Sequence, residues 1–553
     1  MSYKYSNLRK SYILSVLMAV FIFGSCKKLD LSPRDRFTDD NFWQINNNVF
    51  NALNTVYSRM GTSQRYFYNE ALSDNAYAQL EANVGTPTTI ASGLSSVFTS
   101  DLLRVLQDWT AYYQGIYAAN LFLENADKNT SIDPALLTRM KAEARFIRAY
   151  QYFNLINWFG DVPLITKIIT PDESKQLPRT PKAEVLKFIL DELDAAAAGL
   201  PKKEDYQEAD NGRITKGAAK AFKARVLLYQ GDRMEEVAAI CEDLMNDQAT
   251  NGAYALYPDY GKLFSDPNTE YNPEIMLDLE YVPDVRTYDE PSRMIPISGG
   301  GFGENYNAPT QELVDSYIML NGKAILESGS GYDESNPYVN RDPRLHATVV
   351  YDKDIWKNAD GSTQTIYIKP GSDPSPSKTN EFGAGLHTPT GYYWRKYYDP
   401  SVVANRYSLN LILIRWADVL LMYAEAKDAL GQMTATVWDK TVKLVRQRAG
   451  FTDATALNYP GNTSLSMRDQ IRNERRSEFA MESLRIDDIR RWKIAENVLD
   501  GWVHGARWGD PSVDNGYVRV THREFDPSKH YLWPVPALEI RDDPNLLPQN
   551  PNW

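Results

Sequence analysis

The stretch "TKGAAKAFKARVLLYQGDRMEEVAAICEDLMND", Thr215 to Asp247, decides the fold class of this chain of 553 residues. Its first half is rich in alanine, and its second half has the spacing of apolar residues that is typical of a helix. Gly231 and Asp232 separate the halves, and glycine commonly ends a helix. The stretch therefore predicts two helices joined by a short turn, in which small residues of one admit bulky residues of the other.

A second stretch repeats this plan much later in the chain. It is "WADVLLMYAEAKDALGQMTATVWDKTVKLVRQRAG", Trp416 to Gly450. Both stretches resemble the tetratricopeptide helix pair, whose stacked copies bury a continuous core. A strict period of about 34 residues is absent, so the prediction of repeats depends on helix pairing.

Four stretches before the first pair also predict helices. They cover residues 41–60, 102–126, 133–160 and 180–199. The last two have start and stop signals: Asp133 and Thr180 are predicted N-caps, and each is followed by a proline. The aromatic residues on these helices, Trp109, Trp158 and Phe159, fit a core role better than a ligand contact.

Residues 254–409 have a different character, rich in glycine, proline, asparagine and tyrosine with short alternating stretches. This pattern predicts loops with small strands. Long loops on a helical scaffold are usually functional or disordered, and the many aromatic residues argue against disorder. The predicted fold is mainly α: a tetratricopeptide-like helical-repeat scaffold with a loop-rich, small-strand region packed on it.

The N-terminus contains "VLMAVFIFGSCKKLD", Val16 to Asp30. Its apolar run is too short to span a bilayer, which takes about 20 residues, and it follows basic residues as in a signal peptide. The end of the run resembles the lipobox of bacterial lipoproteins, with Phe23 in place of the usual aliphatic residue. Residues 1–25 are then a lipoprotein signal peptide and Cys26 is lipidated; the alternative is a secretory signal followed by an incidental cysteine.

Composition excludes several functions. The net charge of −12 argues against a nucleic-acid partner, because such proteins neutralise phosphates with clustered Lys and Arg. The five histidines lack metal-ligand spacing, and no catalytic or phosphate-binding motif is found. Cys241 lies in a helical pattern and is expected to be buried and unreactive. We expect no catalytic residue, no metal and no cofactor. The unusual feature of the composition is its aromatic content of 12%.

Motifs along nearly the whole chain point to one family. They are "SCKKLDLSPRDRFTDDNFW", "AEARFIRAYQYFNLINWFGDVPL", "APTQELVDSYIMLNG", "RDPRL", "IRWADVLLMYAEAKDALG", "IRNERRSEFAMESLRIDDIRRW" and "YLWPVPALEIRDDPNLLPQNPNW". In this order they resemble the SusD/RagB family of Bacteroidetes outer-membrane lipoproteins. The resemblance implies a helical fold, a lipid (palmitate) anchor at the cell surface, no catalysis, and nutrient capture for a SusC-like TonB-dependent transporter. It also implies the regions 26–253, 254–409 and 410–553, the second of which lies on the ligand side.

Most of these motifs have a structural interpretation. Arg475 and Glu478 are three residues apart, as are Glu482 and Arg485, which predicts ion pairs that hold helices together. The closing "WPVPALEI" is predicted to be an extended segment across the helices, because proline is excluded from helix interiors.

Three functions remain open. The leading hypothesis is a surface protein that binds oligosaccharide, because aromatic rings suit the apolar faces of sugars and Asn, Asp and Arg suit their hydroxyls. Peptide capture is the alternative within the family. A glycoside hydrolase is the alternative from another class, and it needs a pair of carboxylates at about 5 Å or at about 6.5–9.5 Å.

The ligand site is predicted on the loops after the first helix, "SQRYFYNEALSDNAYAQLEAN", together with the glycine-rich "SGGGFGENYN". Tyr77 is the predicted stacking platform, with Asp74 and Asn75 as hydroxyl partners. The other predicted contacts are Tyr66, Tyr68, Phe302 and Tyr306, and the resemblance implies ligand contacts in loops at similar places. If this segment is not the site, the next candidates are Trp356, Tyr392 and Trp394 of the later loop region.

Overall fold

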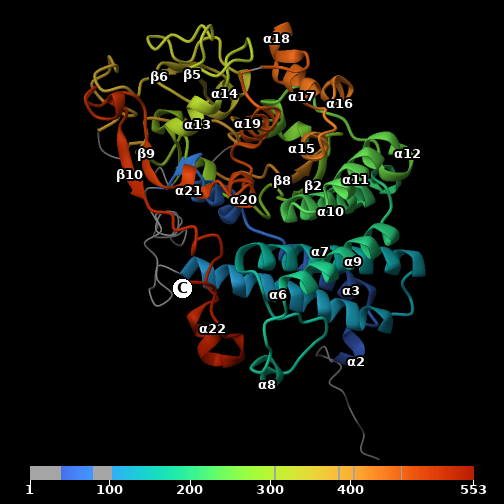
Figure 1. The fold of residues 1–553 in the computed structure, drawn as a ribbon. Coiled ribbons are helices and arrows are strands. Elements are labelled where there is room, and N and C mark those ends of the chain that lie inside the picture. Colours follow the sequence, from blue (N-terminus) through green and yellow to red (C-terminus); the bar gives the residue numbers. More distant parts are fainter. Residues whose placement is uncertain (1–38, 79–102, 304–306, 384–386, 403–404, 463) are drawn as a thin grey trace, which may run out of the picture.

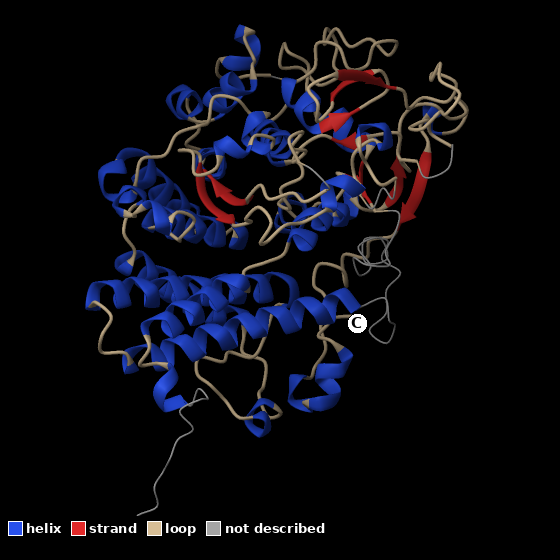
Figure 2. Ribbon diagram, turned by 180° about the vertical axis from the view of Figure 1, so that it is seen from behind, coloured by secondary structure: helices blue, strands red, loops and turns tan. Residues whose placement is uncertain are grey.

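The computed structural model describes residues 39–78, 103–303, 307–383, 387–402, 405–462 and 464–553. The fold is mainly helical, as predicted (Figures 1 and 2). One layer contains α3 (Asn46–Ser58), α6 (Leu103–Asn125), α7 (Pro134–Phe159) and α9 (Lys182–Gly199). The next contains α10 (Lys216–Gln230), α11 (Met234–Asn246) and α15 (Trp416–Ala429). The loops and most of the short strands lie beyond this second layer, at the top of Figure 1.

The helix pair predicted at residues 215–247 is α10 and α11. The Thr215 side chain accepts a hydrogen bond from Ala218 N at the start of α10, and Gly231 ends α10 with a positive φ of 83°. The alanines of α10 are buried, and α11 packs against both α10 and α15. The free thiol of Cys241 is fully buried, and burial raises its pKa, as expected for an unreactive cysteine.

The start and stop signals were partly correct. Asp133 caps α7 by accepting from Ala135 N and Leu136 N, and Gly160 ends it. The predicted cap of α9 by Thr180 is wrong, because the backbone of Thr180 pairs with Val162. Instead the Asp161 carboxylate, which the chain brings back from the end of α7, accepts a hydrogen bond of 2.7 Å from Lys182 N.

Two other predicted segments differ from the structure. The helix predicted over residues 41–60 is broken into α2 (Asp39–Phe42) and α3, with Ile45 exposed between them. The closing segment is extended only to Pro536, where α22 (Ala537–Asp542) begins. Proline is excluded from helix interiors and not from helix starts, so the prolines did not forbid this helix.

The strands of the described residues form five antiparallel pairs. These are β1 (Ala76–Tyr77) with β3 (Ala308–Pro309), β2 (Ile275–Leu279) with β8 (Leu411–Arg415), β4 (Val349–Val350) with β7 (Tyr393–Trp394), β5 (Asp354–Lys357) with β6 (Thr363–Ile366), and β9 (Gly501–His504) with β10 (Arg519–Arg523). Tyr77 is opposite Ala308 in the first pair. β1, within the first predicted ligand stretch, therefore pairs with the strand that directly follows the second.

The remaining α-helices, most of them short, and two of the 3₁₀ turns are used below. They are α4 (Ser63–Tyr68), α8 (Pro171–Ser174), α12 (Gln248–Asn251), α13 (Gln311–Ser316), α14 (Pro343–Thr348), α16 (Ala435–Lys440), α17 (Val442–Ala449), α18 (Ala454–Leu457), α19 (Met467–Phe479), α20 (Arg485–Arg491), α21 (Ala495–Val498), and the 3₁₀ turns η1 (Asn69–Leu72) and η8 (Glu290–Arg293). Trp109, Trp158 and Phe159 belong to the core, as predicted. None of the described helices combines the length and the apolar character needed to cross a membrane.

Candidate functional site

The predicted ligand segment is largely buried. Tyr66 and Tyr68 are almost without exposed surface. The Tyr66 hydroxyl lies 2.7 Å from the Tyr397 hydroxyl and donates to Ile412 O at 2.9 Å. In this structure both rings belong to the packing beneath the loops.

Asp74 and Asn75 are buried as well, and both have partners from the C-terminal region. Arg485 donates to both carboxylate oxygens of Asp74, and Arg476 Nη2 lies 3.1 Å from Oδ2. Asn75 donates to Glu70 at 2.7 Å and accepts from Arg476 at 2.8 Å. Burial alone would raise the pKa of Asp74, but the charges of Arg476 and Arg485 outweigh it and lower that pKa well below its usual value.

Backbone contacts hold the same segment. Arg523, at the end of β10, donates to Ser73 O at 2.6 Å, Ala76 O at 2.9 Å and Ala71 O at 3.1 Å. Tyr77 directly follows Ala76, the last of the residues that Arg523 contacts, and it is partly exposed. We therefore regard Tyr66, Tyr68, Asp74 and Asn75 as supports, and carry Tyr77 forward as a ligand-facing candidate.

Phe302 lies in the wall of a cavity of about 470 Å³. We call it the Phe302 cavity; it is lined by Ser63, Thr287, Tyr288, Asp289, Glu290, Phe302, Asn405 and Arg406. The Phe302 ring is 42% exposed, and Arg293 lies over it at 5.5 Å. Phe302 N donates to Ser292 O at 2.7 Å, which holds the Phe302 backbone beside η8. Tyr306, predicted to close the site with it, lies outside the described residues.

Polar groups of several kinds surround this ring. Glu290 Oε1 accepts from Ser63 Oγ at 3.0 Å, whereas Glu290 Oε2 is buried without a hydrogen-bond partner among the described residues. Burial raises the pKa of this carboxyl. Asn405 Oδ1 accepts from Ser292 Oγ at 2.8 Å, and Arg406 pairs with the exposed Asp284 at 3.0 Å. The cavity therefore combines an apolar ring face with hydrogen-bond donors and acceptors.

Sequence reasoning missed Glu290, Asn405 and Arg406. Glu290 belongs to η8, Asn405 and Arg406 follow it by more than a hundred residues, and none of the three is part of a spaced motif. The alternative candidates Trp356, Tyr392 and Trp394 are all buried, in agreement with core packing. The Tyr392 hydroxyl, for example, donates to Gln311 at 2.7 Å.

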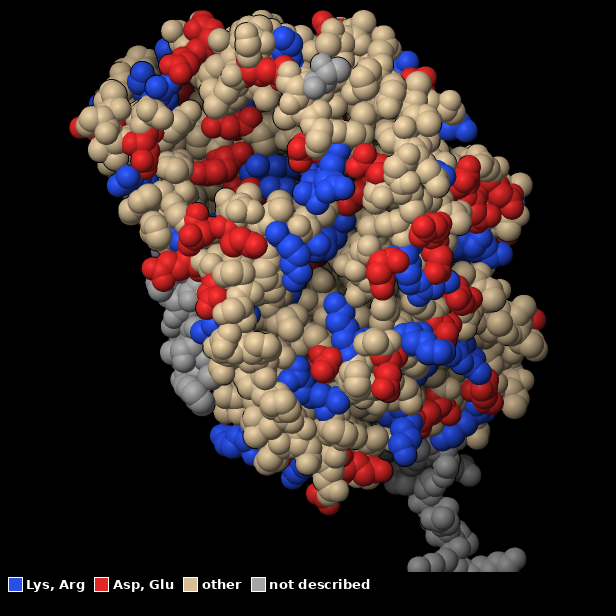
Figure 3. Space-filling model, in the orientation of Figure 1, with Lys and Arg blue, Asp and Glu red and all other residues tan. Residues whose placement is uncertain are grey.

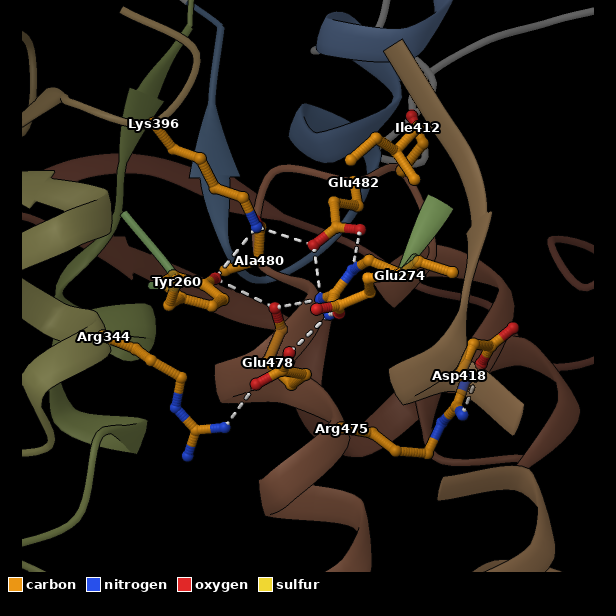
Figure 4. Close-up of polar contacts among 12 residues, drawn as sticks. Tyr260, Glu274, Arg344, Lys396, Ile412, Asp418, Arg475, Glu478, Ala480 and Glu482 are labelled. Atoms are coloured by element: carbon orange, nitrogen blue, oxygen red, sulfur yellow. Dashed lines mark hydrogen bonds and ion pairs between the residues drawn. The ribbon is translucent and has the colours of Figure 1, made fainter. Parts of the chain in front are cut away.

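Below the loops, a buried ionic network joins the C-terminal motifs (Figure 4). Arg415, at the end of β8, contacts Glu274 at 2.8 Å, Glu478 at 2.5 Å and Glu482 at 2.8 Å. Lys396 joins the network through Glu482 at 2.6 Å. The predicted pairs Arg475–Glu478 and Glu482–Arg485 are not formed among the described residues, because Glu478 and Glu482 pair with Arg415 and Arg485 pairs with Asp74. The ionic network that was expected to hold elements together is present, but with other partners.

Two other arginines of the network also pair with carboxylates of other elements. Arg344 of α14 contacts Glu478 at 2.8 Å, and Arg475 contacts Asp418 of α15 at 2.9 Å. Burial would raise the pKa of Glu478, but Arg448, Arg415 and Arg344 lower it well below its usual value. A carboxylate held ionised by three arginines is not suited to proton transfer, so this motif is structural.

The exposed charges are mixed in sign. Figure 3 shows one face, where Lys and Arg side chains gather near the middle and Asp and Glu side chains lie on both sides. The arginines Arg491 and Arg485 of α20, in contrast, are largely buried, and they pair with Glu425 at 2.6 Å and with Asp74. No group of three or more His, Cys, Asp or Glu among residues that the structure describes is placed to hold a metal ion.

The structure is that of a helical-repeat binding protein, in which helix pairs support a loop region with a polar, aromatic-walled cavity. Two family models match the chain. A model described as the SusD family matches residues 273–553, and one described as "Starch-binding associating with outer membrane" matches residues 29–228. The chain belongs to the SusD/RagB family, which confirms the resemblance found in the sequence.

Known relatives extend over nearly the whole chain. "SusD-like protein P25" of Formosa agariphila is 25% identical over 576 aligned positions, which cover 97% of this chain and 98% of that protein. A SusD-like carbohydrate binding protein from Bacteroides fragilis has a crystal structure with a TM-score of 0.80 and 30% identity, covering 92% of this chain and 100% of that one. A laminarin binding SusD-like protein, at 22% identity, 92% and 99% coverage and a TM-score of 0.66, supports the fold alone.

Proposed function

We propose that this protein captures oligosaccharide in the Phe302 cavity, at the surface of an outer membrane, and delivers it to a SusC-like TonB-dependent transporter. The observation that carries the proposal is the half-exposed Phe302 ring in a cavity with otherwise polar lining. The predicted carbohydrate chemistry supports it, as does the similarity to a starch-binding family model and to a SusD-like carbohydrate binding protein.

The cavity suits a sugar ring for a physical reason. A sugar has an apolar C–H face and a rim of hydroxyls that both donate and accept hydrogen bonds. Phe302 offers a surface for the apolar face, while Asp289, Asn405 and Arg406 in the lining offer polar groups for the hydroxyls. Tyr77, in the β1–β3 pair, is proposed as a further contact.

The anchor and the partner belong to the same proposal. Cys26 lies outside the described residues, and its lipidation is inferred from the lipobox-like "FGSC" and from the description of the matching N-terminal model. Detergent-solubilised pull-down of the native protein tests the partner. Recovery of an outer-membrane barrel is the expected result, and its absence would count against delivery to a transporter.

The first screen is affinity electrophoresis in gels that contain starch, laminarin or a panel of other glycans, with a peptide mixture as the competing ligand class. Retardation by a glycan and no release of reducing sugar is the expected result. Retention by peptides alone would favour the peptide-binding alternative. Turnover of a retarding glycan would mean that the protein is a hydrolase.

A further inference from the structure

A second and larger cavity lies on the other side of the helical layer. Its volume is about 720 Å³, and its walls come from the end of α3, the outer face of α6, the loop that contains α8, and the tail around α22. Figure 1 shows α8 and α22 at the end of the molecule where α2 and α3 lie, away from the loop region. We call this cavity the α6 groove; it shares no lining residue with the Phe302 cavity.

Aromatic rings of α6 line the groove. Tyr113 and Tyr117 are four residues apart and therefore lie on one face of the helix. The Tyr113 hydroxyl donates to Pro163 O at 2.9 Å, which fixes this ring in the wall. Tyr117 is 53% exposed, so part of its ring is open to a ligand in the groove. The groove wall thus contains the Tyr113 ring, which is held by its hydrogen bond, and the Tyr117 ring, which is partly exposed.

The rim has free charges of both signs. Glu539 and Lys175 line the groove and have no hydrogen-bond or ion-pair partner for their charged groups among the described residues. Burial, helped by Asp542, raises the pKa of Glu539. Arg59 and Gln114 bond each other at 3.0 Å at another edge. This balance of donors and acceptors suits a neutral ligand with many hydroxyls better than a strongly charged one.

We infer that the α6 groove is a second carbohydrate site, which binds another sugar unit of the same polysaccharide through Tyr117. The inference depends on the proposed function, because it assumes that the protein binds glycans. Two sites on one molecule bind a long chain more tightly than either site alone, since the second contact is intramolecular. Short oligosaccharides gain nothing from this and occupy the sites independently.

The test is isothermal titration calorimetry with maltohexaose and laminarihexaose on the wild type and on Tyr117→Ala, Phe302→Ala and the double variant. The wild type is expected to bind two molecules of the oligosaccharide, each single variant one, and the double variant none. Loss of a stacking ring should weaken its site about 5- to 150-fold. Tyr117→Phe, which keeps the ring, and Leu538→Ala, an exposed residue of α22 outside the lining, should bind as the wild type does.

The outcomes separate this inference from the proposed function. A wild-type stoichiometry of one that Phe302→Ala abolishes and Tyr117→Ala leaves unchanged would overturn the second site alone. Absence of binding in every protein at millimolar oligosaccharide would overturn both. In starch or laminarin gels, Tyr117→Ala should reduce retention at least tenfold while Tyr117→Phe does not. Loss of peptide binding with intact glycan binding in Tyr117→Ala would overturn the assignment to carbohydrate.

Discussion

Arg485 donates two hydrogen bonds to Asp74, of 2.8 and 2.9 Å, across 411 positions of sequence. The pair is buried and joins α20 to the segment that precedes β1. A bidentate pair between a guanidinium and a carboxylate fixes both partners in orientation as well as position. Asp74 therefore acts as a tie between the C-terminal motif and the loop that leads to Tyr77.

Asp74→Asn should lower the free energy of unfolding by about 3–5 kcal/mol, because it leaves buried guanidinium groups without their counter-charge. Since folding lowers the pKa of Asp74, its contribution is present above the unfolded value of about 3.9 and is lost as pH falls below it. Urea unfolding at pH 7 and pH 3 measures both effects. Asp191→Asn, in an exposed pair with Lys187, is the control and should change stability by less than about 0.5 kcal/mol. Equal effects of the two substitutions would refute the structural role of Asp74.

Arg415→Met should destabilise the fold by about 3–5 kcal/mol, because it leaves Glu274, Glu478 and Glu482 buried without their shared cation. Thermal unfolding followed by circular dichroism measures the change. Arg541→Met, at an exposed position of α22, is the matched control and should be neutral. A neutral Arg415→Met would mean that the network is not important for stability.

His504 predicts a pH effect on the β9–β10 hairpin. Its Nδ1 lies 2.7 Å from Glu312 of α13 and its Nε2 lies 3.2 Å from Asp514. The hydrogen bond to Glu312, followed by the charges of Glu312 and Asp514, raises the pKa of His504. A raised pKa adds stability below the unfolded value of about 6.5, and this stability is lost as pH rises through the folded value.

Hydrogen exchange of residues 501–523, corrected for intrinsic rates, should be slower at pH 5.5 than at pH 8.5. His504→Gln should remove that difference, and a variant that keeps it would show that another group is responsible.

Cys26→Ala should move the protein from the membrane to the soluble fraction. One acyl chain gives only marginal binding, so the several chains of a lipoprotein are needed for stable attachment. Fractionation with detection by antibody measures the change. Cys241→Ala removes the other cysteine and should leave the protein at the membrane. Retention of Cys26→Ala at the membrane would mean that the lipoprotein interpretation is wrong.

Helices were predictable because their signals are local. The cap Asp133 and the stop Gly160 lie next to the helix that they delimit, and α7 has the predicted bounds. The cap of α9 was missed because Asp161 reaches Lys182 across a loop, so the hydrogen bond depends on tertiary structure.

The site was harder to predict for the same reason. A tyrosine looks the same in the sequence whether its ring is buried, as that of Tyr66 in α4 is, or exposed, as that of Tyr117 in α6 is. Phe302 was named from the sequence as a candidate and stays one, whereas Asn405, which lines the same cavity, lies more than a hundred residues away in the sequence.

The most direct test of the central claim is calorimetry of Phe302→Ala with the oligosaccharide that corresponds to the retarding glycan. At the Phe302 cavity we expect affinity to fall about 5- to 150-fold, as for the loss of one stacking ring, with an unchanged melting temperature. The control is Leu326→Ala, which removes an apolar side chain that is 88% exposed elsewhere on the molecule and should bind as the wild type does. Unchanged affinity and stoichiometry in a folded Phe302→Ala would contradict the claim that this cavity binds the glycan.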